Sequence, residues 1–332
     1  MQYSDHNSVA LKSDFSLIWF LKTCFWRVVS KFFKSDTTVR VSPDFEVVQS
    51  LRRSGDVNSF PVLRGKYRNQ ADERVIKYVH GGPWDIHRLL LRHEAGMLDL
   101  LQKVTENEQS CEVNFPKFVR YEEAPRHAYL ELSFIPAQKV VANPAMLVRQ
   151  LVRIISGLQF VGTKMLETGA QMFLPQKGMA SIVLCFPCHT IKLFLRGLIP
   201  FSFVRLLLAY FYHTLWNAWG SAQYTFSHRD IHSENVIVNG DKLYLIDPAV
   251  AVWSFQETDA AIAARNYFGK LGEPGLRSLL RKLQAEHINE TWFWLLSVYN
   301  TVHYLSYTNP TARYYQSALM YLHYLESNVL QK

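Results

Sequence analysis

The sequence predicts an α+β fold of two lobes, a small β-rich lobe with one helix followed by a larger, mainly helical lobe. Three observations support this. Strand-like runs dominate the first part of the chain, helical patterns dominate from Pro144 onward, and a single clear hairpin, VIVNGDKLYLID, interrupts the helical part. The expected organisation is an N-terminal appendage over 1–40, the first lobe over 41–136 and the second lobe over 137–332.

The composition is that of an ordinary folded protein. The chain has 332 residues, 48% of them hydrophobic and 19% charged, with no low-complexity tract and no solenoid or propeller repeat. A net charge of +8 favours anionic partners such as nucleotides, phosphate-bearing substrates or an acidic membrane, and we predict no nucleic-acid partner. Four cysteines make no disulfide framework, which favours a reducing compartment. The first residues, MQYSDHNSVALKSD, lack a secretory pattern.

The N-terminal appendage contains an amphipathic, aromatic segment, FSLIWFLKTCFWRVVSKFFK, from Phe15 to Lys34. At helical period its polar and basic residues form one stripe, and Phe, Trp, Leu, Ile and Val fill the rest. Lys22 and Arg27 make it too charged for a confident membrane span. A basic helix rich in Trp and Phe is typical of a membrane interface, and the alternative is a helix packed on the protein's own core.

A second apolar region runs from Ile182 to Trp216. Charged residues, together with Pro187 and Pro200, are expected to divide it into pieces shorter than a bilayer span. We therefore predict core helices here, with the pieces nearest Ile182 still able to touch lipid. Within this region Cys185, Cys188 and His189 form a CxxCH pattern. Its place in an apolar helix argues against haem attachment, and two buried thiols are expected instead.

The first lobe is expected to begin after the turn-forming Ser-Pro-Asp sequence at residues 42–44. The runs FEVVQSL, SFPVLRGKY and RVIKYV are strand-like, and HAYLELSFIPAQ is expected to form a strand that ends at Pro136. The first two runs are joined by RRSGDVN, which contains Gly55. Backbone N–H groups in such a turn can hold phosphates, so Gly55 is a candidate cofactor-binding residue, and a plain hairpin turn is the alternative.

A Lys and a Glu in this lobe are predicted to pair. Lys77 lies in RVIKYV between apolar residues, and DIHRLLLRHEAGMLDLLQK has helical periodicity from an Asp85 N-cap. Glu94 falls on the apolar face of this helix, where an acid normally needs a partner. Lys77 is the nearest candidate, and a strand Lys fixed by a helix Glu can hold an ammonium group against nucleotide phosphates. A nucleotide would then lie between the lobes, near the connector at 134–136.

The hairpin gathers two carboxylates and an amide. Its turn contains Asn239-Gly240, a preferred type I′ pair. Asn235 begins the first strand and Asp247 follows the second, so both lie at the same end. Asp230 precedes Asn235 by five residues, enough for a loop that turns back toward them. This geometry offers Asn235 and Asp247 as ligands for Mg²⁺ and leaves Asp230 for a substrate hydroxyl.

These residues resemble the protein-kinase-like fold and, within it, the aminoglycoside phosphotransferase and lipopolysaccharide-kinase branch. Residues 228–235 match the catalytic-loop pattern H-x-D-x-x-x-x-N, and Asp247 matches the first residue of the metal-binding D-F-G. Lys77 and Glu94 match the strand Lys and helix Glu of the smaller lobe. The resemblance covers about residues 44–260, with the elements in the family's order.

The resemblance implies an ATP- and Mg²⁺-dependent kinase. Asp230 would orient the acceptor hydroxyl or accept its proton, Asn235 and Asp247 would hold Mg²⁺, and Lys77 would contact the α- and β-phosphates. His228 would be a structural residue of the loop. The acceptor would be a sugar, a lipid-linked or lipopolysaccharide-type saccharide, or another small molecule.

The departures from the protein-kinase pattern indicate the branch. His232 stands where protein kinases usually have Lys, and Asp247 is followed by Pro-Ala instead of Phe-Gly. No A-P-E motif follows, and only PAVAVWSFQET separates Asp247 from the next helix, so no long activation segment is expected. Asp259 is a candidate structural acid that supports the catalytic loop. The alternatives are a pseudokinase scaffold and a protein kinase. The expected location is the cytoplasm, at the cytoplasmic face of the inner or plasma membrane.

Overall fold

A computed structural model describes most of the chain. The described residues are 44–51, 61–68, 70–80, 85–106, 108, 111–137, 143–312 and 314–330. The Gly55 loop and the appendage over 1–40 lie outside the described residues, so the predictions made for them stay predictions. The boundaries proposed at 40 and 136 likewise stay predictions.

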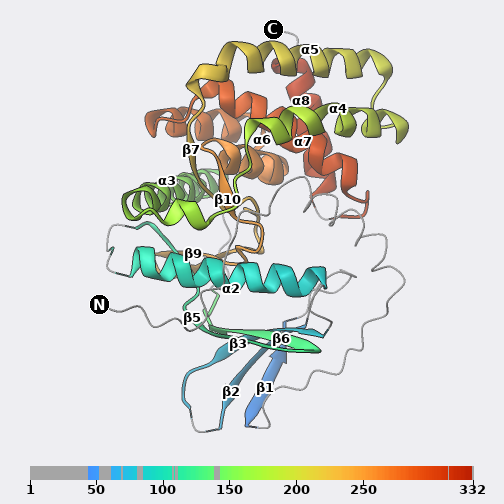
Figure 1. Cartoon of the computed structure of the whole chain (residues 1–332). Coiled ribbons are helices and arrows are strands. Elements are labelled where there is room, and N and C mark those ends of the chain that lie inside the picture. Colours follow the sequence, from blue (N-terminus) through green and yellow to red (C-terminus); the bar gives the residue numbers. More distant parts are fainter. Residues whose placement is uncertain are drawn as a thin grey trace.

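The first lobe is a five-stranded antiparallel sheet with one helix packed on it (Figure 1). A small apolar core lies between sheet and helix, with Leu91, Ala95 and Leu98 of α2 facing Leu130 and Leu132 of β6. The predicted N-cap is confirmed, because the Asp85 side chain accepts a hydrogen bond from His87 N at 2.8 Å. The elements, in sheet order and then the helix, are β1 (Phe45–Ser50), β2 (Val62–Tyr67), β3 (Arg74–His80), β6 (His127–Ser133), β5 (Phe118–Ala124) and α2 (Ile86–Thr105).

Two details of this lobe differ from the expectation. Strand β6 ends at Ser133, three residues before Pro136, which has no N–H group to extend the ladder. Strand β5 was not predicted, although FVRYEEA and HAYLELS are two β-rich runs on either side of a short turn at Pro125.

The second lobe is mainly helical and carries the larger core. Helices α3, α6 and α7 form its interior, and α8, α4 and α5 pack around them. Figure 1 shows α5 at the end of the molecule farthest from the first-lobe sheet. The elements are β4 (Val113–Asn114), α3 (Pro144–Thr168), η2 (Ala170–Phe173), α4 (Met179–Leu195), α5 (Phe201–Ala218), η3 (Trp219–Ser221), β7 (Tyr224–Ser227), β8 (Val236–Asn239), β9 (Lys242–Leu245), β10 (Val252–Phe255), α6 (Thr258–Ala285), α7 (Glu290–Tyr307) and α8 (Tyr315–Asn328).

The predicted hairpin is present as β8 and β9, with a different turn. Asn239 pairs with Lys242, so Gly240 and Asp241 occupy the two central turn positions. Of these two only Gly240 has a positive φ, 59°. Positive φ at the first central residue alone is the sign pattern of a type II′ turn, and the predicted type I′ turn is therefore wrong. Strand β4 pairs with β9 in parallel and completes a three-stranded sheet with the hairpin.

Pro187 does not divide the second apolar region as predicted. Helix α4 continues from Met179 to Leu195 through it. A proline removes the N–H that would bond to the carbonyl four residues earlier, here Val183. The Tyr212 hydroxyl of α5 donates to Val183 O at 3.2 Å and so satisfies this carbonyl from outside the helix. The thiols also differ from the expectation, because Cys185 is half-buried and Cys188 is exposed.

One described helix, α3, is long and apolar enough to cross a membrane by length and composition, and half of that stretch is buried inside the protein. It packs on α6, α2 and β7. Its burial is that of a core helix.

Glu257, just before α6, is a buried acid whose protonation should make stability depend on pH. Its Oε1 accepts from Asn289 N at 3.1 Å, whereas its Oε2 is buried without a partner. Burial raises its pKa from 4.5 to about 7. A raised folded-state pKa means that stability is lost as pH rises from the unfolded to the folded value.

Glu257→Gln removes this pH-dependent loss. Relative to wild type, the variant should gain about 3 kcal/mol of unfolding free energy between acidic and neutral pH, because each pKa unit corresponds to about 1.4 kcal/mol. Urea unfolding at pH 4.5 and at pH 7 measures the difference. Glu286→Gln, an exposed position at the other end of α6, is the control, and an unchanged difference for Glu257→Gln would contradict the prediction.

Candidate active site

Three predicted residues from different elements meet at the junction of the lobes. Lys77 of β3 contacts two carboxylates: its Nζ lies 2.5 Å from Glu94 Oε1 of α2 and 3.2 Å from Asp247 Oδ1, after β9. The predicted Lys77–Glu94 pair is therefore confirmed. Glu94 is fully buried, whereas the Asp247 side chain is 26% exposed.

Burial and charge act in opposite directions on this cluster. Burial alone would lower the pKa of Lys77, but the carboxylates of Asp247 and Glu94 outweigh it and the pKa is raised. The ammonium group therefore stays charged. Burial raises the pKa of Glu94 to about 7, against the opposing effect of Lys77. Glu94 consequently serves to fix the ammonium, and Asp247 is the carboxylate that remains accessible.

The catalytic-loop residues form a second group. Asn235 Nδ2 donates to Asp230 Oδ2 at 2.8 Å and to Asp230 O at 3.0 Å. His232 Nε2 lies 3.3 Å from Asp230 Oδ2, and His232 Nδ1 accepts from Glu234 N at 3.2 Å. Because Nδ1 is the acceptor, Nε2 carries the proton that faces Asp230.

Asp230 is an ionised and accessible carboxylate. Burial acts to raise its pKa, but the contact with His232, the nearby His228 and the hydrogen bond from Asn235 outweigh it, so the pKa is lowered. The Asp230 side chain is 40% exposed to solvent. An ionised, accessible carboxylate is what a hydroxyl acceptor requires for orientation or proton transfer.

The backbone is strained at both catalytic segments. Arg229 and Asp247 have positive φ values of 65° and 64°. Such conformations are costly for non-glycine residues and persist only where the surroundings hold them. Asp259 at the start of α6 holds the first of them, because its carboxylate accepts from His228 N at 2.8 Å and from Arg229 N at 2.7 Å. Its predicted role as a structural acid is confirmed.

Asp259→Asn should destabilise the protein and lower its activity. An amide can accept only one of the two backbone N–H bonds, and its NH₂ would face the other donor. Losing one buried bond in this way costs about 1–3 kcal/mol. Urea unfolding measures the loss, and Asp99→Asn, an exposed change on α2 beside Lys103, is the matched control. Equal midpoints for the two variants would refute the assigned role.

Two further residues fix the loop: His228, which was predicted to be structural, and Asn266, which the sequence did not single out. His228 Nε2 lies 3.0 Å from Ile246 O and so joins the catalytic loop to the residue before Asp247. Burial lowers the pKa of His228 to about 4, so its ring is neutral, as expected of a structural residue. Asn266 Nδ2 of α6 donates to Ile231 O at 2.8 Å. No local pattern marks Asn266, because its role depends on a contact across 35 positions.

A divalent cation fits the donor set only together with phosphates. The described residues contain no group of three or more His, Cys, Asp or Glu side chains placed to hold a metal. Asn235 turns its amide nitrogen toward Asp230, so its oxygen is the atom that can bind a cation. Asp247 supplies a carboxylate that Lys77 contacts at present. Mg²⁺ typically takes one or two protein oxygens, with phosphates and waters completing the octahedron, and these residues fit that pattern.

Two basic side chains in and beside the catalytic loop have no carboxylate partner within salt-bridge distance among the described residues. Lys177, half-buried, has its Nζ 4.7 Å from the centre of the Tyr299 ring. Burial lowers the pKa of Lys177 well below its usual value, and Arg229 adds to the effect. The Nε of Arg229 is buried without a hydrogen-bond partner. Burial therefore disfavours the charged form of Lys177, and Arg229 is the side chain that supplies unpaired positive charge beside Asp230.

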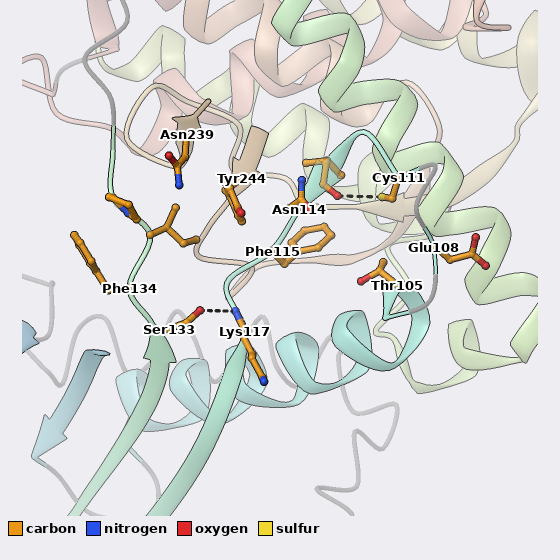
Figure 2. Close-up of a pocket in the computed structure, with 13 residues that line it drawn as sticks. Thr105, Glu108, Cys111, Asn114, Phe115, Lys117, Ser133, Phe134, Asn239 and Tyr244 are labelled. Carbon is orange, nitrogen blue, oxygen red and sulfur yellow. Dashed lines mark hydrogen bonds between the residues drawn. The ribbon is translucent and has the colours of Figure 1, made fainter. Parts of the chain in front are cut away.

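A cavity of about 350 Å³ lies at the lobe junction (Figure 2). It is lined by the connector at 133–136, by Asn239 and Tyr244 of the hairpin, and by residues between α2 and β5. Figure 2 shows the hydrogen bond that Lys117 N donates to Ser133 and the ring of Phe134 among the lining side chains. None of its lining residues belongs to the Lys77 or Asp230 groups, so we assign no catalytic role to it.

A model of the phosphotransferase enzyme family matches residues 204–293, a segment that contains the catalytic loop and Asp247. No curated protein matches the chain in sequence.

Solved structures of small-molecule kinases share the fold over nearly the whole chain. A microcompartment-associated aminopropanol kinase has a TM-score of 0.55 at 13% identity, covering 93% of this chain and 98% of its own. An aminoglycoside phosphotransferase in ternary complex with ADP and hygromycin B has 0.54 at 10%, covering 86% and 95%. An amicoumacin kinase in complex with AMP-PNP and Ca²⁺ has 0.52 at 12%, covering 94% and 95%.

These likenesses confirm the predicted two-lobed fold and its resemblance to the aminoglycoside phosphotransferase branch. The resemblance to lipopolysaccharide kinases stays a prediction.

Proposed function

We propose that this protein is an ATP- and Mg²⁺-dependent phosphotransferase that phosphorylates a hydroxyl group of a small-molecule acceptor. The observation that carries the proposal is the convergence of Lys77, Glu94 and Asp247 at the junction of the two lobes. A scaffold without activity has no physical need to place an ammonium group between two carboxylates and also to keep Asp230 ionised and accessible. The family match and the kinase fold of the solved structures support the same activity.

In this proposal each residue has one task. Lys77, fixed by Glu94, would hold the α- and β-phosphates of ATP, and Asn235 and Asp247 would bind Mg²⁺, which neutralises phosphate charge. Asp230 would hold the acceptor hydroxyl in line with the γ-phosphorus and accept its proton as the new P–O bond forms and the bond to the ADP oxygen breaks. Catalysis would consist chiefly of positioning and charge neutralisation.

The acceptor is proposed to be a sugar, a lipid-linked saccharide or a similar small molecule at the cytoplasmic face of a membrane. The apolar, basic segment Phe15–Lys34 supports peripheral association, and the short stretch after Asp247 argues against a protein substrate. The unpaired guanidinium of Arg229 favours an acceptor that carries an anionic group.

Labelled ATP tests the proposal. The purified full chain is incubated with γ-labelled ATP, Mg²⁺ and fractionated lipid and glycan extracts, neutral and acidic, with an Asp230→Asn sample in parallel. Label transferred to a lipid or glycan by wild type alone supports it. Label on peptides would favour a protein kinase instead. Transfer to nothing, with equal cellular complementation by wild type and Asp230→Asn, would favour the pseudokinase scaffold.

A further inference from the structure

Helices α4 and α5 present an apolar outer face to solvent. Of the exposed large apolar side chains in the described part of the chain, 10 of 20 lie between residues 172 and 219. Leu195 is 76% exposed and Trp216 is 83% exposed, values unusual for side chains of this size. A concentration of this kind marks an interaction surface.

The exposed residues form one stripe on each helix. On α4 they are Leu184, Ile191 and Leu195, and on α5 they are Phe201, Tyr212 and Trp216, all at spacings of one to several helical turns. We refer to these six residues as the α4–α5 outer face.

The stripe on α4 and the stripe on α5 are joined by contacts at both ends of the helix pair. Phe194 and Phe201 are in edge-to-face contact, with ring centroids 5.9 Å apart. At the other end, Tyr212 reaches across to Val183 O. The opposite faces of the two helices are occupied, because Phe186 and Phe211 stack at 3.9 Å and both helices pack on α7. The outer face therefore points away from the core, at the end of the molecule distant from the first-lobe sheet (Figure 1).

The charge of this region indicates what covers the face. Between Glu167 and Asp230 the sequence contains no Asp or Glu, and the part of it that runs from α4 through α5 contains Lys192, Arg196 and Arg205. Arg205 is exposed within the α5 stripe and Lys192 is exposed beside Ile191 on α4. Exposed Trp, Tyr, Phe and Leu together with basic residues, and no acids, match a lipid interface that carries negative charge.

We propose that the α4–α5 outer face docks on an anionic lipid surface, with Leu195, Phe201 and Trp216 in the headgroup–acyl boundary and Arg205 and Lys192 at the phosphates. The two helices lie in the plane of the membrane and do not cross it. The proposal does not depend on phosphotransfer.

Vesicle sedimentation without nucleotide tests the proposal. The full chain is mixed with vesicles of phosphatidylcholine alone, or with about 30% phosphatidylglycerol to give a negative surface potential. Wild type should bind the anionic vesicles more strongly. Leu195→Ser/Trp216→Ser should lower the partition coefficient by about tenfold, since two large apolar groups leave the interface. Arg205→Gln should lower binding only to the anionic vesicles.

Matched variants test whether this surface or another part of the protein is responsible for vesicle binding. Met146→Ser/Met320→Ser replaces exposed apolar residues on α3 and α8 and should bind like wild type. Thermal melting confirms that each variant is folded. Binding that persists in Leu195→Ser/Trp216→Ser but is lost in Trp19→Ser/Trp26→Ser would overturn the proposal in favour of the N-terminal segment. A dimer in solution that only Leu195→Ser/Trp216→Ser dissociates would overturn it in favour of a second copy.

Discussion

Asp230→Asn should lower kcat by about 10²–10⁴-fold, the usual contribution of a positioned general base. The substitution keeps the shape of the side chain but removes the charge that His232 and Asn235 stabilise. The acceptor hydroxyl would then lose both its orienting partner and its proton acceptor. The rate of label transfer to the identified acceptor, at saturating ATP, measures the effect.

The control is Asp241→Asn, the same change at the exposed tip of the β8–β9 hairpin that follows the catalytic loop. It should leave kcat unchanged. Asp230→Asn should also retain the stabilisation by Mg·ATP, because the proposed nucleotide ligands are other residues. A kcat within about twofold of wild type would show that Asp230 is not the group that activates the hydroxyl, since general bases contribute far more than this.

Asp247→Ala should abolish the rise in Tm that Mg·ATP produces. A ligand present at 100 times its Kd stabilises the folded state by about 2.7 kcal/mol, which corresponds to roughly 5 °C for a chain of this size. Asp247 is the accessible carboxylate of the Lys77 cluster, and its loss would remove one proposed Mg²⁺ ligand. Differential scanning fluorimetry with and without EDTA measures the shift and its dependence on the metal.

A second variant tests whether a change in the backbone at position 247, instead of the lost carboxylate, explains the result. Asp247 has a φ of 64°, a conformation that Asn tolerates better than Ala. Asp247→Asn should therefore lower the melting temperature of the free protein less than Asp247→Ala does and still lose most of the Mg·ATP shift. Asp241→Ala is the matched control. A full shift in both Asp247 variants would mean that this carboxylate does not bind the metal–nucleotide complex.

The sequence was sufficient to predict a feature where that feature depended on a single helix or strand. Asp85 was predicted as an N-cap because a capping side chain acts within one helical turn. Glu94 was predicted to need a cation because an acid on an apolar helical face cannot remain unpaired. The hairpin was predicted from its β-rich runs, but its type II′ turn depended on strand register, which turn residues alone did not specify.

The tertiary structure decided the support of the site. The bonds from Asp259 to His228 N and Arg229 N span about 30 positions, and Asn266 reaches Ile231 from another helix. Such contacts leave no periodic pattern in the chain. Pro187 is a similar case, since a local rule predicted a break and a hydroxyl from a neighbouring helix removed the cost.

The sequence by itself thus determined the order of the lobes and which side chains carry charge at the site, because periodicity and motif spacing are local properties. Only the tertiary structure decided that Lys77 contacts both Glu94 and Asp247. It also decided that the apolar stripes of α4 and α5 are left outside the core, because burial depends on which faces the neighbouring helices occupy.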